Sequence, residues 1–287
     1  MSKFMQINFK INGESLLIGN DCPIKIVTTP EGIESSDFIV HTSSNATLDG
    51  STVSGKKVEE RVISVTFAID DLRNTETIRE ELIKFFNPKH PIELEVTYGN
   101  RTRRITGEML EFKFTSQSSM WDYLEARLSV KCPYPYFANM DNFGKNIASI
   151  TPQFAFPLYI PPGGRIHSYR AFQQETTLLN DGDVPTGIEI RLIAERGQVT
   201  NPKITKVSTG EFIEVVREMN KGDVIIINTN QGNKAIYFNS ENITNEKSKL
   251  SSFFSIDIGA NVISYDAEEN YTNLDVRLYY SPKYLGV

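Results

Sequence analysis

The sequence KCPYPYFANMDN at residues 131–142 divides the chain into two parts. Proline has no backbone N–H group and fixes its own φ angle, so Pro133 and Pro135 cannot extend a ladder of sheet hydrogen bonds. The apolar residues just before this stretch alternate with polar ones, as in a strand with one buried face. We therefore expect an extended connector between two domains, which we place at residues 1–138 and 139–287.

The length and charge of the chain narrow the class of protein. A chain of 287 residues is too long for one ordinary core, which also favours two domains. The formal net charge of −6 argues against a nucleic-acid binder, because such proteins are usually basic. The sequence has no apolar run long enough to span a membrane and no apolar leader at its start, so we expect folding in a bacterial cytoplasm without a membrane anchor.

The first part predicts a sheet or split barrel with one helix. The apolar residues on one predicted helical stripe are Ile78, Leu82, Phe85 and Phe86. Asn87-Pro88 stops this pattern, so we expect a helix over residues 77–86 that packs on the sheet. Apolar and polar residues alternate in the predicted strands, which are residues 5–11, 16–18, 22–27, 63–69, 92–98, 101–109 and 124–132.

Residues 31–57 form a long polar stretch that interrupts this regular pattern. So long a connection in a compact domain is unusual, and it is either a surface loop or an arm that becomes ordered against a neighbour. The stretch contains Gly50–Lys56, which fits the spacing of a phosphate-binding loop. Lys57 stands where such a loop needs Ser or Thr, and a strand pattern follows instead of a helix. The sequence therefore predicts no nucleotide site here.

The second part predicts an antiparallel β-sandwich. Short alternating segments follow one another at regular spacing, with turn residues such as Ser208-Thr209-Gly210 between them. The predicted strands lie near residues 188–192, 204–207, 212–216, 224–227, 235–238, 254–258, 262–265 and 274–278, with an edge strand near 154–160. The fold class of the whole chain is thus mainly β with one helix.

The chain lacks the residue patterns that would predict a catalytic, cofactor or metal site. The three histidines are far apart in sequence, and the two cysteines lie in apolar strand patterns that indicate buried thiols. Neighbouring carboxylates and the basic group Arg101, Arg103 and Arg104 indicate solvated faces, and Trp121 indicates a packed aromatic side chain. We therefore expect no catalytic, cofactor-binding or metal-binding residues, and no enzyme activity. The histidines are His41, His90 and His167, the cysteines are Cys22 and Cys132, and the carboxylates are Asp70, Asp71, Glu80, Glu81, Glu268 and Glu269.

The order of these features along almost the whole chain resembles the distal tail proteins of long-tailed, flexible-tailed phages that infect Gram-positive bacteria. The first part contributes the helix pattern and KCPYPYF. The second part contributes LLNDGDVPTGIEIRL at 178–192, NPKITKVSTGEFIEV at 201–215, the Lys221-Gly222-Asp223 step, FFSIDIGANVISY at 253–265 and LYYSPKYLGV at 278–287.

The resemblance implies a structural protein of the tail tip of a phage, a prophage or a tail-like bacteriocin. The first domain would form a homohexameric ring, and the second would be a galectin-like sandwich that projects outward. The implied partners are the tail tube protein, the tape measure protein, the tail-associated fibre or lysin protein and, in some phages, a receptor-binding protein. DNA would only pass through the channel, no membrane partner is implied, and residues 31–57 would be an arm or a channel-lining loop.

Two other functions remain open at this point. A carbohydrate-binding sandwich would need an aromatic platform for cell-wall sugar, for which Tyr159, Tyr169, Tyr237 and Tyr265 are the candidates. A glycosidase would need two carboxylates across a cleft, a geometry that sequence does not reveal.

Overall fold

The computed structural model describes residues 5–44, 49–69, 75–115, 124–140, 143–146, 150–152, 168–170 and 174–287. The chain forms two units. The first unit contains Met1–Met140 together with Lys283–Val287, and the second contains Asp141–Pro282. The predicted division assigned residues 283–287 to the second domain. They belong instead with the first unit, because Lys283 and Tyr284 pair with a strand of that unit.

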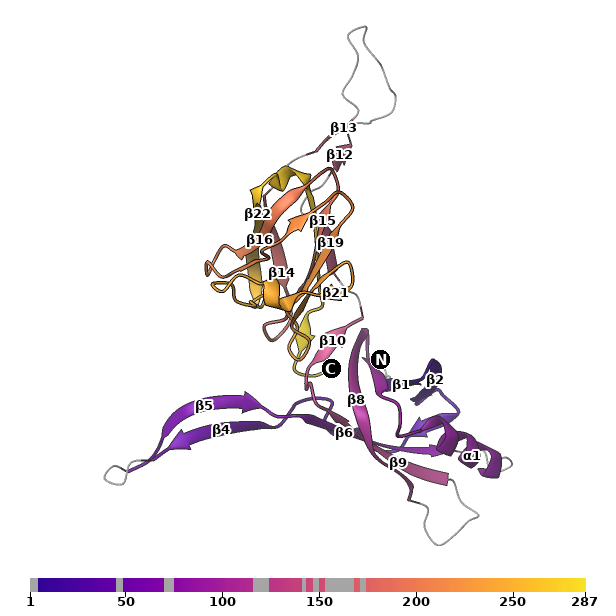
Figure 1. The fold of residues 1–287 in the computed structure, drawn as a ribbon. Coiled ribbons are helices and arrows are strands. Elements are labelled where there is room, and N and C mark those ends of the chain that lie inside the picture. The colour runs from indigo at the N-terminus through magenta and orange to yellow at the C-terminus, as the bar shows by residue number, and fades with distance from the viewer. Residues whose placement is uncertain are drawn as a thin grey trace. The chain divides into compact units, whose positions relative to one another are not determined.

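The first unit is built on a sheet that nearly closes on itself (Figure 1). Every pair of neighbouring strands is antiparallel along the order β2-β1-β7-β8-β9-β6-β3. The two ends of this path, β2 and β3, are consecutive in the chain and lie next to each other. The strands are β1 Met5–Ile11, β2 Glu14–Gly19, β3 Ile24–Ile26, β6 Arg61–Ile69, β7 Ile92–Tyr98, β8 Arg101–Phe114 and β9 Leu124–Cys132.

Strand β8 joins the two halves of this sheet. Its first half pairs with β7, and its second half, from Glu108 onward, pairs with β9 with a bulge between Met109 and Glu111. A bulge bends a strand and increases its twist, which helps the sheet to curve. Gly107 allows a close approach at this bend, since a Cβ atom there would lie 2.6 Å from the carbonyl oxygen of Lys131. The short strands β10 (Phe137–Asn139) and β24 (Lys283–Tyr284) extend the sheet from β8.

The predicted helix is present as α1, Thr75–Phe85. Leu82 and Phe86 are buried in the core of the first unit, while Ile78 and Phe85 are packed against it. The Phe86 ring contacts Phe9, whose centroid lies 5.7 Å away, and it contacts rings from β6 and β8 as well. The helix therefore covers the sheet interior with the stripe that the sequence predicted.

The second unit is an antiparallel β-sandwich of the galectin-like type. One sheet has the order β11-β23-β15-β19-β20-β21, and the other has β14-β22-β16-β17 with β18 beside β16. Apolar side chains of both sheets share one core, which includes Ile190, Leu192, Val276, Leu178, Ile204 and Ile263. The six strands of the first sheet are β11 Phe143–Asn146, β15 Glu189–Ala194, β19 Val224–Asn228, β20 Ala235–Phe238, β21 Glu241–Asn242 and β23 Leu274–Tyr280. The second sheet contains β14 Glu175–Asn180, β16 Val199–Lys206, β17 Phe212–Glu214, β18 Glu218–Met219 and β22 Gly259–Glu269.

Smaller elements complete the second unit. Strands β12 (Ile150–Pro152) and β13 (Ser168–Arg170) form a separate two-stranded sheet, and Thr244–Glu246 and Tyr271–Asn273 form short 3₁₀ helices. The edge strand predicted near residues 154–160 lies outside the described residues. The strand predicted at 254–258 is irregular apart from one bridge between Ile256 and Thr186, and Ile258 is exposed.

Candidate assembly surface

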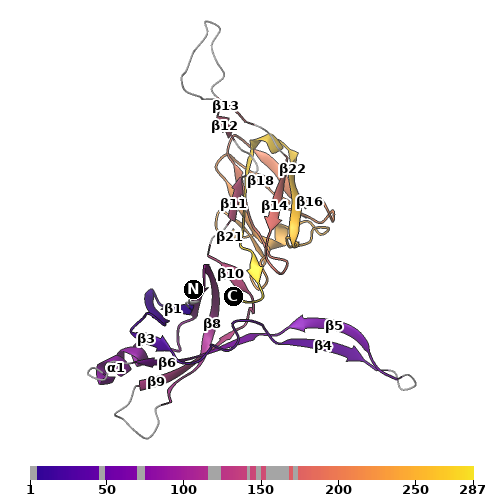
Figure 2. The same cartoon turned by 180° about the vertical axis from the view of Figure 1, so that it is seen from behind.

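The long polar stretch of the first unit is a β-hairpin, which we call the arm. It consists of β4 (Phe38–Ser43) and β5 (Thr52–Val58), which pair only with each other among the described residues. Figures 1 and 2 show these two strands side by side, leaving the sheet of the first unit near the start of β6. The arm is therefore an ordered ribbon, in contrast to the surface loop that was one of the two predictions from sequence.

The arm exposes apolar side chains that have no core to enter. Phe38 is 72% exposed and Val53 is 51% exposed, and Ile39 and Val40 are also exposed. Phe38 and Val40 alternate onto one face, where Val58 lies opposite Phe38. The two strands carry Lys56 and Lys57 and no carboxylate. An isolated two-stranded ribbon is marginally stable in water, so these features make the arm a candidate surface for contact with a partner.

The Arg61 side chain fixes the arm base, which is residues 32–34 ahead of β4, to the rest of the first unit. Arg61 is buried, its Nε donates a hydrogen bond to the carbonyl of Pro135 over 2.8 Å, and its Nη1 donates to the carbonyl of Gly32 over 2.6 Å. Its Nη2 donates to the carbonyl of Leu285, and the guanidinium lies 4.9 Å from the Phe137 ring centroid. One side chain thus joins the arm base, the connector between the units and residues 283–287.

The Arg61 side chain is almost fully shielded from solvent. Burial lowers the pKa of the Arg61 guanidinium and raises the pKa of the nearby Cys132 thiol to about 12, even though the Arg61 charge acts in the opposite direction on Cys132. An arginine remains protonated in such a site. Its N–H groups donate hydrogen bonds to carbonyl oxygens here rather than to a carboxylate. Cys132 and Cys22 are both buried free thiols, as the sequence predicted.

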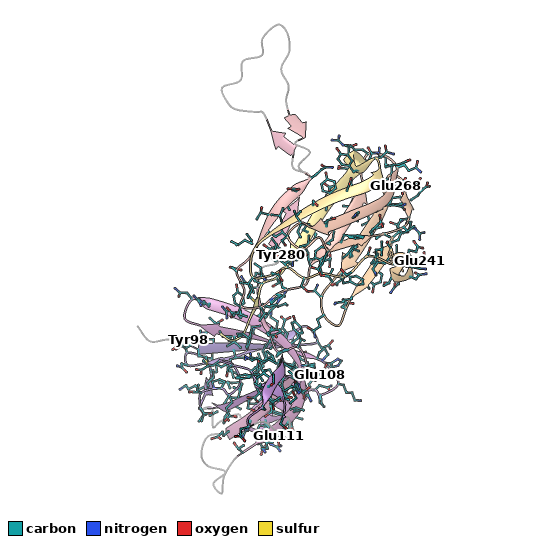
Figure 3. All side chains as sticks on the ribbon, turned by 90° about the vertical axis from the view of Figure 1, so that its left-hand side faces the viewer. Tyr98, Glu108, Glu111, Glu241, Glu268 and Tyr280 are labelled. Carbon is teal, nitrogen blue, oxygen red and sulfur yellow. The ribbon has the colours of Figure 1, made fainter. Side chains whose placement is uncertain are left out.

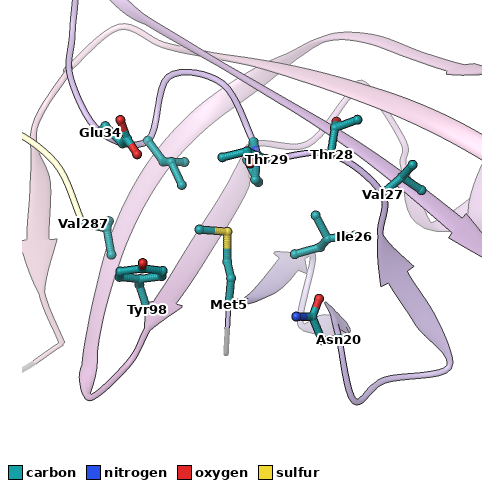
Figure 4. A pocket seen from close by; sticks show the side chains of 11 residues that line it. Met5, Asn20, Ile26, Val27, Thr28, Thr29, Glu34, Tyr98 and Val287 are labelled. Carbon is teal, nitrogen blue, oxygen red and sulfur yellow. The ribbon is translucent and has the colours of Figure 1, made fainter. Parts of the chain in front are cut away.

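A cavity of about 500 Å³ opens beside the arm base (Figure 4). Its lining comes from the start of β1, the segment after β3, the end of β7 and Val287. Figure 4 shows Tyr98, Met5, Val287 and Glu34 around it. Among the described residues that line the cavity, Glu34 has the only charged side chain, so these residues form no acid–base pair.

The residues that sequence singled out for chemistry do not come together. His41 lies on the arm and His90 follows α1, while His167 lies outside the described residues. Within the described ranges no group of three His, Cys, Asp or Glu side chains could hold a metal ion. Gly50–Lys56 leads into strand β5 without a helix, so it has no phosphate-binding context. Glu268 and Glu241 lie on the outside of the sandwich, as Figure 3 shows.

The proposed sugar platform lacks one of its tyrosines. Tyr265 is 2% exposed and belongs to the sandwich core, so it cannot stack on a sugar. Tyr237 is half-buried on β20. Tyr159 and Trp121 lie outside the described residues, as does the side chain of Tyr169. Asp70 and Asp71 also lie outside them, and Glu80 and Glu81 are exposed on α1.

The basic group on β8 is only partly a solvated face. Arg103 lies over the Tyr284 ring, 3.6 Å from its centroid, and donates a hydrogen bond to the carbonyl of Gly286. Only Arg101 of the three is exposed, and Arg104 is half-buried. Sequence reasoning missed this contact because Tyr284 and Gly286 are about 180 residues further along the chain.

In the part of the chain that the structure describes, no helix has both the length and the apolar character needed to cross a membrane.

Comparison with known proteins defines the class to which this fold and surface belong. Residues 11–156 match a family model described as a phage tail protein RIFT-related domain. Residues 181–284 match a second model, described as the C-terminal domain of a siphovirus-type tail component. No curated protein sequence matched the chain. The first match covers most of the first unit and the second match lies mostly in the second unit, and together they define a structural component of a phage tail.

Solved structures agree with this class. The SPP1 Dit (gp 19.1) protein, described as a paradigm of the hub adsorption apparatus in phages that infect Gram-positive bacteria, aligns with a TM-score of 0.69 at 12% identity, over 97% of this chain and 99% of that one. A chain of the phage p2 baseplate in its activated conformation with Ca aligns over 100% of both chains, with a TM-score of 0.56 at 8% identity. At these identities the likeness establishes the fold.

The chain belongs to the family of phage tail proteins with a RIFT-related domain, and the match of its second part to the siphovirus-type tail component supports a distal tail protein. It is a structural component of the phage tail tip, as the resemblance in its sequence implied.

Proposed function

We propose that this distal tail protein assembles into a homohexameric ring through its first unit, residues 1–140 with 283–287. The observation that carries the proposal is the arm, whose exposed Phe38, Val40 and Val53 need a covering surface. A head-to-tail contact that closes by rotation buries the same surface of every copy, which suits an arm that leaves its own unit. The two lysines of the arm also favour a neighbour from a chain whose net charge is −6.

The ring would be a hub between tail components. Above it would lie the tail tube protein and the tape measure protein, and below it the tail-associated fibre or lysin protein. The sandwich of the second unit, residues 141–282, would project outward and carry a receptor-binding protein in some phages. DNA would only pass through the channel. The descriptions of the similar structures as a hub protein and a baseplate support this placement.

We infer further that the protein has no catalytic activity of its own. The family model describes a tail component, and among the described residues no group of three His, Cys, Asp or Glu side chains could hold a metal ion. Incubation of the purified protein with cell-wall glycan should release no sugar, and reproducible release that depends on a single carboxylate would contradict this inference.

A photocrosslinking experiment tests the role of the arm. A benzophenone amino acid replaces Phe38 on the arm, or Leu250, which is 84% exposed on the second unit, as the matched control. Equal amounts of ¹⁴N and ¹⁵N protein are mixed, and mass spectrometry identifies crosslinks between one light and one heavy copy.

We expect intermolecular crosslinks from position 38 to residues of the first unit of another copy, and far fewer from position 250. Equal crosslinking from both positions, or crosslinks from position 38 only within one copy, would contradict an arm that contacts its neighbour.

A further inference from the structure

Residues 283–287, which we call the returning segment, are held by the first unit in the way a bound peptide is held. Phe137 and Ala138 of β10 pair with Tyr284 and Lys283. The N–H of Val287 donates a hydrogen bond to the carbonyl of Ile33 over 3.1 Å. The carbonyl of Leu285 accepts a hydrogen bond from Arg61, and the carbonyl of Gly286 accepts one from Arg103. Addition of a strand through main-chain hydrogen bonds is a common mode of peptide recognition.

Side chains of the returning segment fit separate sites. Tyr284 is buried, and the Arg103 guanidinium covers its ring at 3.6 Å. Val287 lines the cavity beside the arm base, together with Tyr98 and Glu34 (Figure 4). Leu285 between them is 41% exposed. Sites for individual side chains along an extended peptide give this mode of binding its specificity.

Gly286 is the residue that the site selects most strictly. A Cβ atom at this position would lie 2.1 Å from the carbonyl oxygen of Glu34 and 3.1 Å from that of Ile33. Both oxygens belong to the main chain of the arm base, so neither can move aside in the way a flexible side chain can. A side chain at this position therefore forces the segment and the arm base apart.

We propose that the first unit contains a binding site for an extended peptide of the sequence Lys-Tyr-Leu-Gly-Val, which residues 283–287 occupy, and that its occupation fixes the base of the arm. The site touches the arm base at three consecutive residues. Arg61, which binds Leu285, also donates a hydrogen bond to the carbonyl of Gly32. Val287 donates to the carbonyl of Ile33, and Gly286 lies against the carbonyl of Glu34. An arm with a fixed base presents its apolar face in one direction, which a symmetric contact requires. Only this last consequence rests on the proposed function.

The second unit is inserted into the sequence of the first. The chain leaves the first unit after Met140 and returns to it at Lys283. Arg61 binds both the connector, at Pro135, and the returning segment, at Leu285. Release of the peptide would therefore loosen the connector and the arm base together.

The experiment uses the Cys132 thiol, which is buried near Arg61, as a reporter in the full chain. Cys22 is replaced by alanine so that one thiol remains. Gly286→Ala is compared with Leu285→Ala, which removes an exposed side chain from the adjacent residue. The rate of thiol labelling is measured with and without the synthetic peptide Pro-Lys-Tyr-Leu-Gly-Val, and amide exchange of residues 32–34 is followed in parallel.

We expect Gly286→Ala to label about tenfold faster than the parent, because local opening exposes the thiol, and Leu285→Ala to stay within about twofold. The peptide should slow the labelling of Gly286→Ala in a saturable way, and Pro-Lys-Tyr-Leu-Ala-Val should not. Equal rates for the two variants, or equal effects of the two peptides, would overturn the proposal.

A second variant covers the case in which Gly286→Ala does not fold. The chain that lacks residues 283–287 is titrated with the fluorescent peptide, and its anisotropy is recorded. Binding of Pro-Lys-Tyr-Leu-Gly-Val, with no binding of Pro-Lys-Tyr-Leu-Ala-Val, supports the site. No binding of either peptide overturns the proposal. None of these measurements depends on oligomer formation, so they separate the failure of this site from the failure of the ring.

Discussion

The arm and the sandwich are both antiparallel β-structure, yet they use apolar residues in opposite ways. In the sandwich, Leu192 and Ile190 point into a core that two sheets share. In the arm, Phe38 and Val40 lie on a ribbon with no second layer. The same residue types thus stabilise a core in one region and remain exposed on the surface in the other. We propose that this exposed surface of the arm is where assembly between copies takes place.

The largest expected effect separates the two regions by stability. Leu192→Ala should lower the free energy of unfolding by about 2–5 kcal/mol, because it leaves a cavity in a closed core. Phe38→Ala should change it by less than about 0.5 kcal/mol, since the side chain is mostly exposed in a single copy.

Urea denaturation at the lowest usable protein concentration checks this contrast, because dilution minimises the contribution of assembly to stability. A loss for Phe38→Ala as large as that for Leu192→Ala would mean that the arm packs within its own copy.

The next effect concerns the base of the arm. Arg61→Met should destabilise the first unit by about 3 kcal/mol, because three carbonyls lose the charged donor of one buried and two part-buried hydrogen bonds. The matched control is Arg127→Met. Its exposed side chain lies 3.6 Å from Glu31 in an ion pair that should contribute less than about 1 kcal/mol. Differential scanning calorimetry compares the two variants, and equal small losses would argue against Arg61 as the anchor.

The smallest effect is a pH dependence of stability that comes from Glu95 in the sheet of the first unit. Burial alone would raise the pKa of Glu95, but hydrogen bonds from Lys10 and Asn8 lower it overall. A lowered pKa in the folded state stabilises the protein above the carboxyl's unfolded pKa, and this contribution is lost as the pH falls through the folded pKa.

Glu95→Gln should therefore remove less than about 1 kcal/mol at neutral pH and flatten the acid limb of a stability–pH curve. Glu93→Gln, whose carboxylate lies 3.8 Å from the same Lys10 ammonium, is the control and should change the curve less. A steeper acid limb for Glu95→Gln would contradict the assignment.

Sequence patterns predicted the parts of the fold that have a buried face. Residues 5–11 and 63–69 alternate because their apolar side chains enter the core, and the stripe of α1 is apolar for the same reason. The arm has no such face, so residues 38–43 and 52–58 carry no alternation against a core and gave no clear strand pattern. The strands near 154–160 remain a prediction.

The contacts of residues 283–287 also escaped sequence analysis, for a different reason. A segment that follows Pro282 at the end of the described chain has no local signal for pairing with β10, about 145 residues earlier. The single glycine at 286 and the tyrosine at 284 become informative only when Glu34 and Arg103 are placed beside them. Likewise, the resemblance to distal tail proteins identified the family without showing how the arm base is held.

The most direct test of the account is the solution mass of the full chain by light scattering, with negative-stain images of the same sample. The account predicts a species of about six times 32.5 kDa that appears as a ring with a central hole. A single copy of 32.5 kDa at every concentration, with no rings in the images, would contradict it.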